Sequence, residues 1–125
     1  SQVWPNAPLL APARVSFQEN MPIEWNRVHD LPDFTYFNHS IHLHKGIGCQ
    51  TCHGEVDQMP LVWKENTLNM EWCLDCHRAP EAHLRPREEV FNLDYKPPPN
   101  QEELAAELIA QYTIQKLDNC SVCHR

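Results

Sequence analysis

The sequence predicts one small domain of mostly irregular chain, with a few short α-helices and little or no β-sheet. Its 125 residues include eleven prolines but only three glycines, and a five-residue cysteine motif occurs three times. Proline fixes its own φ angle and removes a hydrogen-bond donor, which favours fixed, non-repetitive chain over stacked helices or a sheet. A chain of this length also has little room for an ordinary hydrophobic core.

The repeated motif has the form Cys-x-x-Cys-His and occupies residues 49–53, 73–77 and 120–124. Two thiols three positions apart can each form a thioether with one of the two vinyl groups of a single porphyrin. The histidine that follows is then directed at the iron as its proximal ligand. The sequence therefore predicts three covalently bound c-type haems, attached through Cys49, Cys52, Cys73, Cys76, Cys120 and Cys123, with proximal ligands His53, His77 and His124.

Disulfides and zinc are the alternatives for six cysteines. Three disulfides are common in a small exported chain, and paired Cys-x-x-Cys segments occur in zinc ribbons. A zinc ribbon needs four ligands per metal, which would leave one of the three cysteine pairs without a partner pair. Histidine makes up only 8 of the 125 residues, so its chance occurrence after all three pairs is improbable. The haem interpretation is therefore preferred.

The charge and hydropathy of the chain restrict its partners and location. The formal net charge is −7, and haem propionates would add to it. This argues against nucleic acid and anionic membrane surfaces and favours a basic docking patch on another redox protein. No segment is long and apolar enough to span a bilayer, and no signal peptide is recognisable. Because covalent haem attachment takes place outside the cytoplasm, we expect a periplasmic or otherwise extracytoplasmic protein whose export signal has been removed, or part of a longer precursor.

Residues 1–28 are predicted to form a proline-rich N-terminal arm. Within it, residues 11–20 fit a short helix with Val15 and Phe17 facing inward. Further along, Pro32 breaks any helix and leads into the aromatic run of residues 34–37. That run is strand-like by composition, but we expect it to cover a porphyrin face. The arm's tryptophans, Trp4 and Trp25, are expected to pack against a haem or a neighbouring subunit.

Each haem held by such a motif has one axial position still open on its iron. His39 and His42 are three positions apart, so on a helical turn they project from one side and can reach two adjacent irons. Such a pair would hold two haems close together, which suits rapid electron exchange. The histidines available for the open positions are His29, His39, His42, His44 and His83, of which His44 is expected to be solvated.

Other side chains near the second motif have less specific interpretations. Met59 and Met70 offer thioether sulfurs that can also bind haem iron, although packing is the default for each. Arg78, Arg85 and Arg87 are candidates for pairing with propionates, although solvated charge is the default for them.

The segment Phe37-Asn38-His39-Ser40-x-His42, followed closely by a haem motif, resembles the opening of class III cytochromes c, which carry several haems with two histidines on each iron. A closer similarity, to the pentahaem cytochrome subunit of alternative complex III, covers most of the chain. That membrane complex oxidises quinol and passes electrons to a periplasmic carrier or terminal oxidase. The family has two further haem motifs upstream, so we expect either the C-terminal three-haem portion of such a subunit or a trihaem relative. The similar segments are Pro22–Trp25, Val28–Phe34, Tyr36–His42, Gln58–Leu61, Met70–Arg78 and Cys120–Arg125.

The resemblance implies which distal histidine serves which haem. In class III proteins the first histidine of the pair binds the haem that follows at once, and the second binds a different haem. His39 is accordingly predicted to bind the first haem and His42 the second. His29 also matches a family histidine. With His39 and His42 serving the first two haems, it is predicted to bind the third, with His83, a methionine or no protein ligand as open alternatives. Three proximal and three distal histidines then balance three haems.

Residues 100–117 are predicted to form a helix that leads to the last motif. Three prolines at 97–99 form a stiff spacer before it. Asn100 is a suitable N-cap, and Glu103 completes a capping-box pattern. The apolar stripe at helical spacing, which is expected to pack on a haem, consists of Leu104, Ala105, Leu108, Ile109 and Tyr112.

The predicted function is electron transfer rather than enzymatic catalysis. Three low-spin haems would relay electrons between a quinol-oxidising membrane complex and a periplasmic acceptor, or the chain would act as a stand-alone periplasmic shuttle. The rival is catalysis or sensing at an open iron, as in small-molecule reductases. Because five candidate distal histidines are available for three irons, the sequence does not require an open site.

Overall fold

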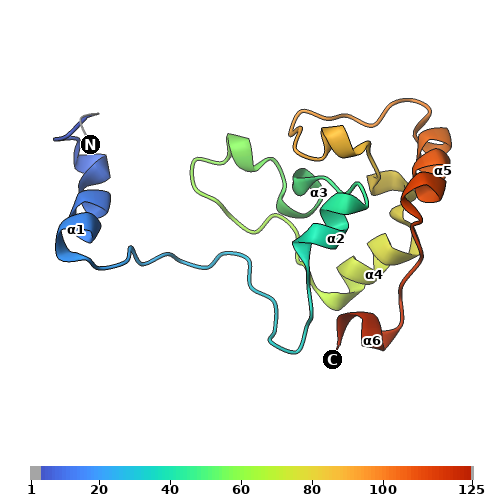
Figure 1. Ribbon diagram of the computed structural model, residues 1–125, viewed down its shortest axis with the longest axis horizontal. Helices are drawn as coiled ribbons and strands as arrows, with labels where there is room; N and C mark the ends of the chain where they lie inside the picture. Colours follow the sequence, from blue (N-terminus) through green and yellow to red (C-terminus); the bar gives the residue numbers. More distant parts are fainter. Residues whose placement is uncertain (1–3, 125) are drawn as a thin grey trace.

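The computed structural model describes residues 4–124, and Figure 1 shows short helices joined by long irregular segments. Within this range no segments pair as a sheet, and the β-type contacts are isolated bridges from Thr35 to His124 and from Ile47 to Leu84. The predicted fold class is confirmed. None of the helices between residues 4 and 124 has the length and apolar composition needed to cross a membrane.

In chain order the elements are η1 (Pro8–Leu10), α1 (Ala11–Glu19), α2 (His39–His44), α3 (Cys49–His53), η2 (Val56–Gln58), α4 (Met70–Arg78), η3 (Pro80–His83), η4 (Arg87–Glu89), α5 (Gln101–Tyr112) and α6 (Cys120–Cys123), where η marks a 3-10 turn.

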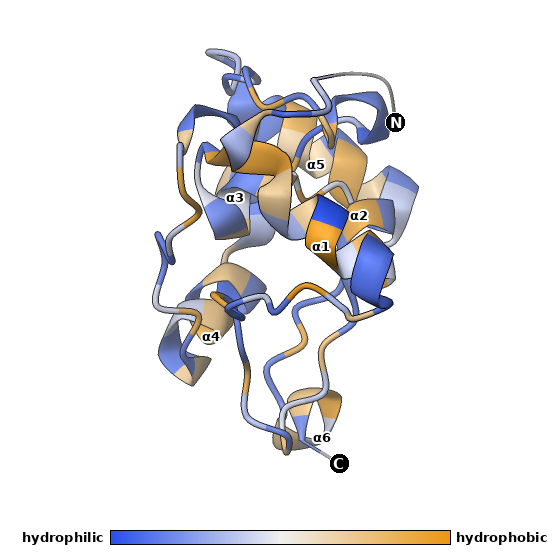
Figure 2. Ribbon diagram, turned by 90° about the vertical axis from the view of Figure 1, so that its left-hand side faces the viewer, coloured by the Kyte–Doolittle hydropathy of each residue, from blue (hydrophilic) through white to orange (hydrophobic). Residues whose placement is uncertain are grey.

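The N-terminal arm extends away from the rest of the molecule. Figure 1 shows α1 at one end, joined to the body by a long extended segment. The expected short helix forms, but the prediction that Val15 and Phe17 face inward is wrong, because both are exposed and Phe17 retains 89% of its surface. Hydrophobic and hydrophilic residues are interspersed along α1 in Figure 2, and none of its residues is buried. Trp4 and Trp25 are exposed as well.

A small hydrophobic core lies between α5 and the two segments that follow α2 and η3. The bridge from Ile47 to Leu84 joins those segments, and the backbone N–H of Arg85 donates to the carbonyl oxygen of Gly46 at 3.0 Å. Gly46 has a φ of +79°, and a Cβ at this position would collide with the carbonyl oxygen of Arg85. The buried side chains of this core are Ile47, Leu84, Ala105, Leu108 and Tyr112.

Helix α5 carries the predicted apolar stripe on its buried face but ends earlier than expected. It ends at Tyr112 rather than near residue 117, because Thr113 adopts a left-handed conformation with a φ of 49°. The ammonium group of Lys45 donates to the carbonyl oxygen of Tyr112 and so satisfies one of the last acceptors of the helix. The side chain of Asn100 makes no capping hydrogen bond, so the predicted capping box does not form.

Two of the short helices that carry histidines begin at asparagine caps. The side-chain oxygen of Asn38 accepts from the backbone N–H of Ser40 at 2.8 Å, at the start of α2. At the start of α4, Asn69 accepts in the same way from Trp72 at 2.9 Å. Such caps satisfy donors that a helix leaves free at its first turn, and they stabilise helices as short as these.

Candidate haem centres

The three cysteine motifs lie on α3, on α4 and at the end of the chain on α6 (Figure 1). All six cysteines are free, so each pair is available for thioether bonds. A zinc site of the kind weighed above would bring several ligands around one point. From Trp4 to His124, no group of three or more His, Cys, Asp or Glu side chains is arranged to hold a metal ion directly.

The three motifs lie near enough to one another for their cysteine thiols to interact. Burial raises the pKa of Cys52 to about 11, and nearby Cys76, Cys73 and Cys49 add to the rise. Burial also raises the pKa of Cys73, with a further contribution from Cys123. In both ribbon views, α4 with the second motif lies between α3 and α6 (Figures 1 and 2). The motifs therefore follow one another in space in their sequence order.

Two histidines of α2 each face a histidine of a different motif. The ring centroids of His39 and His53 are 6.3 Å apart, with their planes 6° from parallel. Those of His42 and His77 are 6.1 Å apart, at 57°. Two imidazoles on opposite sides of one metal ion, each bonded at about 2.0 Å, have centroids roughly 6 Å apart. Both pairs therefore have the spacing that fits a shared haem iron.

In each motif, the Nδ1 atom of the histidine lies within hydrogen-bond distance of an acceptor atom in another segment of the chain. When Nδ1–H donates, Nε2 is left unprotonated and can bind a metal, while the ring is held in one orientation. This arrangement fits iron coordination through Nε2 in all three motifs. The three contacts are His77 Nδ1 to the carbonyl oxygen of Leu117 at 2.7 Å, His124 Nδ1 to that of Phe34 at 3.2 Å, and His53 Nδ1 to Nε2 of His29 at 3.4 Å.

Burial keeps two of these paired histidines in the neutral form that metals bind. It lowers the pKa of His42, against an opposing hydrogen bond from His42 Nδ1 to the carbonyl oxygen of Asn38 at 2.9 Å. It also lowers the pKa of His53, with His29 and His39 contributing in the same direction. Neutral imidazole is the common ligand form, so these shifts favour metal binding near neutral pH.

His29 lies beside the first motif in the structure. Its ring centroid is 4.4 Å from that of His53, in an edge-to-face arrangement. The ring recorded next to His124 is that of Phe34, at 5.8 Å. The assignment of His29 to the third haem therefore stays a prediction. His44 and His83 are exposed.

The aromatic run before α2 contacts the histidines of more than one centre. The ring of Phe37 lies 4.7 Å from both His39 and His42. The backbone N–H of Tyr36 donates to the carbonyl oxygen of Cys123 at 2.7 Å, which brings the third motif against this run. The sequence predicted that the run would cover a porphyrin, but periodicity gave no signal that it would join α2 to the third motif.

The arrangement of cysteine pairs and histidines agrees with the comparison to known families. The model of the family described as cytochrome c7 and related cytochrome c matches residues 35–125. The chain belongs to this family. This cytochrome c7-related chain is thus a class III multihaem cytochrome c and an electron carrier, and its three cysteine pairs are consistent with three c-type haems. The comparison with curated protein sequences gives no match.

The match to cytochrome c7 starts within the aromatic run and includes α2 to α6, while α1 and the extended segment lie before it. Bound haem supplies an iron that gains and loses single electrons. In this cytochrome the cysteine pairs would attach the porphyrins, the Nδ1 contacts would orient the motif imidazoles, and aromatic side chains such as Phe37 would shield the centres. As a class, c-type cytochromes are extracytoplasmic proteins.

Proposed function

We propose that the chain relays electrons through three haems, each with two histidine ligands, between a quinol-oxidising membrane complex and a periplasmic acceptor. The observation that carries this proposal is the pairing of His39 with His53 and of His42 with His77 at centroid distances of 6.3 and 6.1 Å. An iron with two histidine ligands has no open position for a substrate, so such a centre is suited to electron transfer rather than to catalysis.

The proposed ligand assignment follows the geometry for two haems and the sequence prediction for the third. Because α2 contributes a ligand to each of the first two centres, the first and second haems would be held together by one helical turn. The third would follow the second, in the spatial order of the cysteine motifs. The sets are Cys49, Cys52, His53 and His39; Cys73, Cys76, His77 and His42; and Cys120, Cys123 and His124 with His29 as the predicted sixth ligand.

Membership of an alternative complex III-like assembly is the finer part of the proposal. It is supported by the similarity to the pentahaem subunit and by the exposed apolar side chains of the arm, which include Trp4, Phe17 and Trp25. We propose that residues 1–125 form one trihaem domain whose arm, residues 1–28, packs on a neighbouring subunit. The net charge of −7 favours a basic surface on the electron acceptor.

A second candidate function, reduction or sensing of a small molecule at an open iron, is favoured by the surroundings of His124. The ring of Phe34 lies beside His124 and cannot ligate iron. If the third haem lacked a sixth ligand, a small molecule could bind there. Reduction or sensing of a small molecule requires one haem iron with an open axial position. The electron relay requires no open position.

Carbon monoxide distinguishes the two functions. Denaturing mass spectrometry of the purified holoprotein should first show three attached haems. The reduced protein should then bind no stoichiometric carbon monoxide, because each iron has two protein ligands. Rapid binding of one full equivalent would contradict the relay with two histidines per haem and support an open third centre.

The partner proposal is tested with the holoprotein and a detergent-solubilised alternative complex III. We expect quinol to reduce the haems rapidly only when the complex is present. A variant without residues 4–28 should keep its haem spectrum but be reduced more slowly, because the arm would no longer dock. Equal rates for the two proteins would contradict the role of the arm.

A further inference from the structure

The most deeply buried charged side chain of the described residues is that of Arg85, which retains 6% of its exposure and lies between η3 and η4. Burial lowers its pKa, yet a guanidinium group keeps its proton throughout the physiological range. Among residues 4–124 the ion pairs are formed by other basic side chains, namely Arg27, Arg78 and Lys116. Burying a positive charge without a paired carboxylate costs free energy. The groups around the guanidinium of Arg85 determine how much of that cost is offset.

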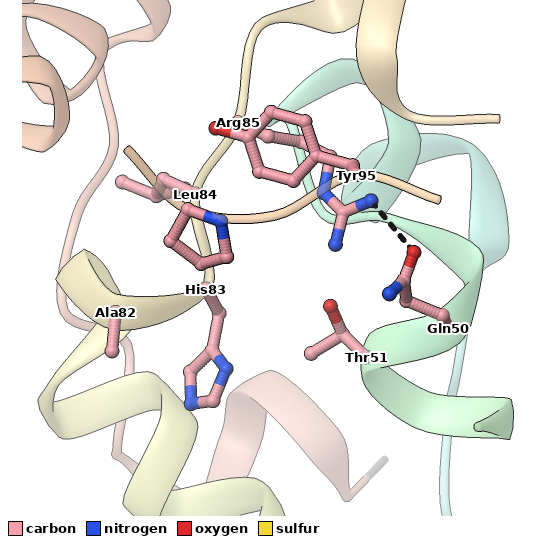
Figure 3. Close-up of a pocket in the computed structure, with 8 residues that line it drawn as sticks. Gln50, Thr51, Ala82, His83, Leu84, Arg85 and Tyr95 are labelled. Carbon is pink, nitrogen blue, oxygen red and sulfur yellow. Dashed lines mark hydrogen bonds between the residues drawn. The ribbon is translucent and has the colours of Figure 1, made fainter. Parts of the chain in front are cut away.

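The guanidinium of Arg85 lies against the helix that carries the first haem motif. Its Nη1 donates to the side-chain oxygen of Gln50, which stands between the two cysteines of that motif, at 3.2 Å (Figure 3). Nη1 also donates to the carbonyl oxygen of Asn92 at 3.2 Å. Gly48 immediately precedes Cys49, and a Cβ at Gly48 would collide with the guanidinium. The charge is therefore held against the first turn of α3.

The carboxylate of Glu89 acts on Arg85 electrostatically, but no described carboxylate forms an ion pair with it. The guanidinium carbon lies 4.4 Å from the ring centroid of Tyr95, and the Nε of Arg85 has no hydrogen-bond acceptor. A cavity of about 260 Å³ adjoins this group and is lined by neutral and basic side chains, with no carboxylate among them. Figure 3 shows Gln50, Thr51 and Arg85 facing this space. A buried charge is screened much less than an exposed one.

The second motif has a different electrostatic environment. Arg78 directly follows His77, so it is as near to its motif in sequence as any cation in the chain. Its side chain is 59% exposed, and its Nε lies 3.8 Å from a carboxylate oxygen of Asp118. Solvent and the nearby carboxylate both weaken its field at the second centre. Among residues 4–124, the first centre thus has a buried cation without an ion pair against its attachment helix, whereas the cation beside the second centre is exposed and paired.

We propose that Arg85 sets the reduction potential of the first haem above that of the second, so that electrons in the relay rest at the first centre. An iron that accepts one electron loses one unit of positive charge, and a fixed nearby cation stabilises that reduced form. Gln50 acts here as a positioning residue that holds the guanidinium in place. The inference rests on the proposed function, in that the first motif carries a redox-active haem.

The decisive variant is Gln50→Glu in the holoprotein, because it gives Arg85 a carboxylate partner without removing any buried group. The matched control is Gln18→Glu, which makes the same change in net charge on the distant helix α1 (Figure 1). Potentials of individual haems are read from NMR signals of their methyl groups during a redox titration. We expect Gln50→Glu to change the ratio of reduced to oxidised first haem at a fixed potential roughly tenfold, equivalent to a decrease of about 59 mV for one electron. Gln18→Glu should leave that ratio nearly unchanged.

A second pair of variants separates charge from packing. Arg85→Lys keeps a positive charge and should retain most of the high potential of the first haem, whereas Arg85→Gln should lose it. The inference is overturned if Gln50→Glu and Gln18→Glu shift the first haem equally, or if Arg85→Lys and Arg85→Gln behave alike. Loss of haem or of the low-spin spectrum in the unaltered protein would instead count against the proposed function, so the two failures are distinguishable.

Discussion

The imidazole ring of His42 lies 6.1 Å from that of His77, across the gap between α2 and the helix of the second haem motif. His39, on the same turn of α2, lies 6.3 Å from His53 of the first motif. One six-residue helix therefore offers a distal ligand to each of two centres, and its histidines can be tested separately.

Replacing His42 with Ala should leave three haems attached, since the cysteines are unchanged, but convert one of them from low-spin to high-spin. The second iron would lose its sixth ligand and should then bind about one equivalent of carbon monoxide. His44→Ala is the matched control, because His44 is exposed on the same helix. Visible and electron paramagnetic resonance spectra measure the spin state. An unchanged spectrum for His42→Ala would rule out His42 as a ligand.

His29→Ala tests the assignment of the distal ligand of the third haem. The sequence prediction that His29 binds the third iron leads us to expect one high-spin haem in this variant. His83→Ala, at the exposed alternative, should keep every haem low-spin. If His29→Ala also remains fully low-spin, the ligand prediction is contradicted. A shift confined to the first haem would then indicate that His29 acts through its contact with Nδ1 of His53.

Asn38→Ala should lower the free energy of unfolding by about 1 kcal/mol, because it removes the cap of α2. Haem content and spin state should be unchanged, since the carbonyl oxygen that contacts His42 belongs to the backbone. Asn100→Ala is the control, because Asn100 makes no capping bond at α5. Guanidinium unfolding of the holoproteins measures both. Equal losses at the two positions would contradict a capping role for Asn38.

The ion pair between Glu81 and Lys116, with 2.9 Å between Nζ and Oε1, predicts a pH-dependent effect on stability. The pKa of Glu81 is lowered by a hydrogen bond with its own backbone and then by Lys116, so its ionised form is favoured in the folded state. A lowered carboxyl pKa stabilises the protein above the unfolded value, usually 4.5, and this contribution is lost as the pH falls through the folded value.

Lys116→Gln should accordingly reduce the free energy of unfolding by roughly 0.5 kcal/mol at pH 7. The difference should disappear as the pH falls through the lowered pKa of Glu81. Both side chains are largely exposed, so 1 M salt should also reduce the difference. Lys96→Gln, at another exposed lysine, is the control for loss of charge. A difference that persists at low pH would show that Lys116 contributes through packing instead.

Local patterns in the sequence predicted the chemistry because that chemistry depends on neighbouring residues. Covalent attachment needs two cysteines and a histidine within five positions, so residues 49–53 could be interpreted without any tertiary contact. The His39–His42 spacing places both side chains on one helical turn, and α2 begins at His39 because Asn38 caps it. The fold class was predictable as well, since proline excludes long regular elements.

Contacts between distant segments were decided by the tertiary structure alone. The burial of Arg85 depends on the segments of Gly46 and Gly48 packing against it, and no local pattern distinguishes it from the exposed Arg78. The last turn of α5 is contacted by Lys45, more than sixty positions earlier, which donates to the carbonyl oxygen of Tyr112. His29 is placed beside His53 by the path of an extended segment that has no periodicity. These features arise from long-range packing, whose partners are far apart in the sequence.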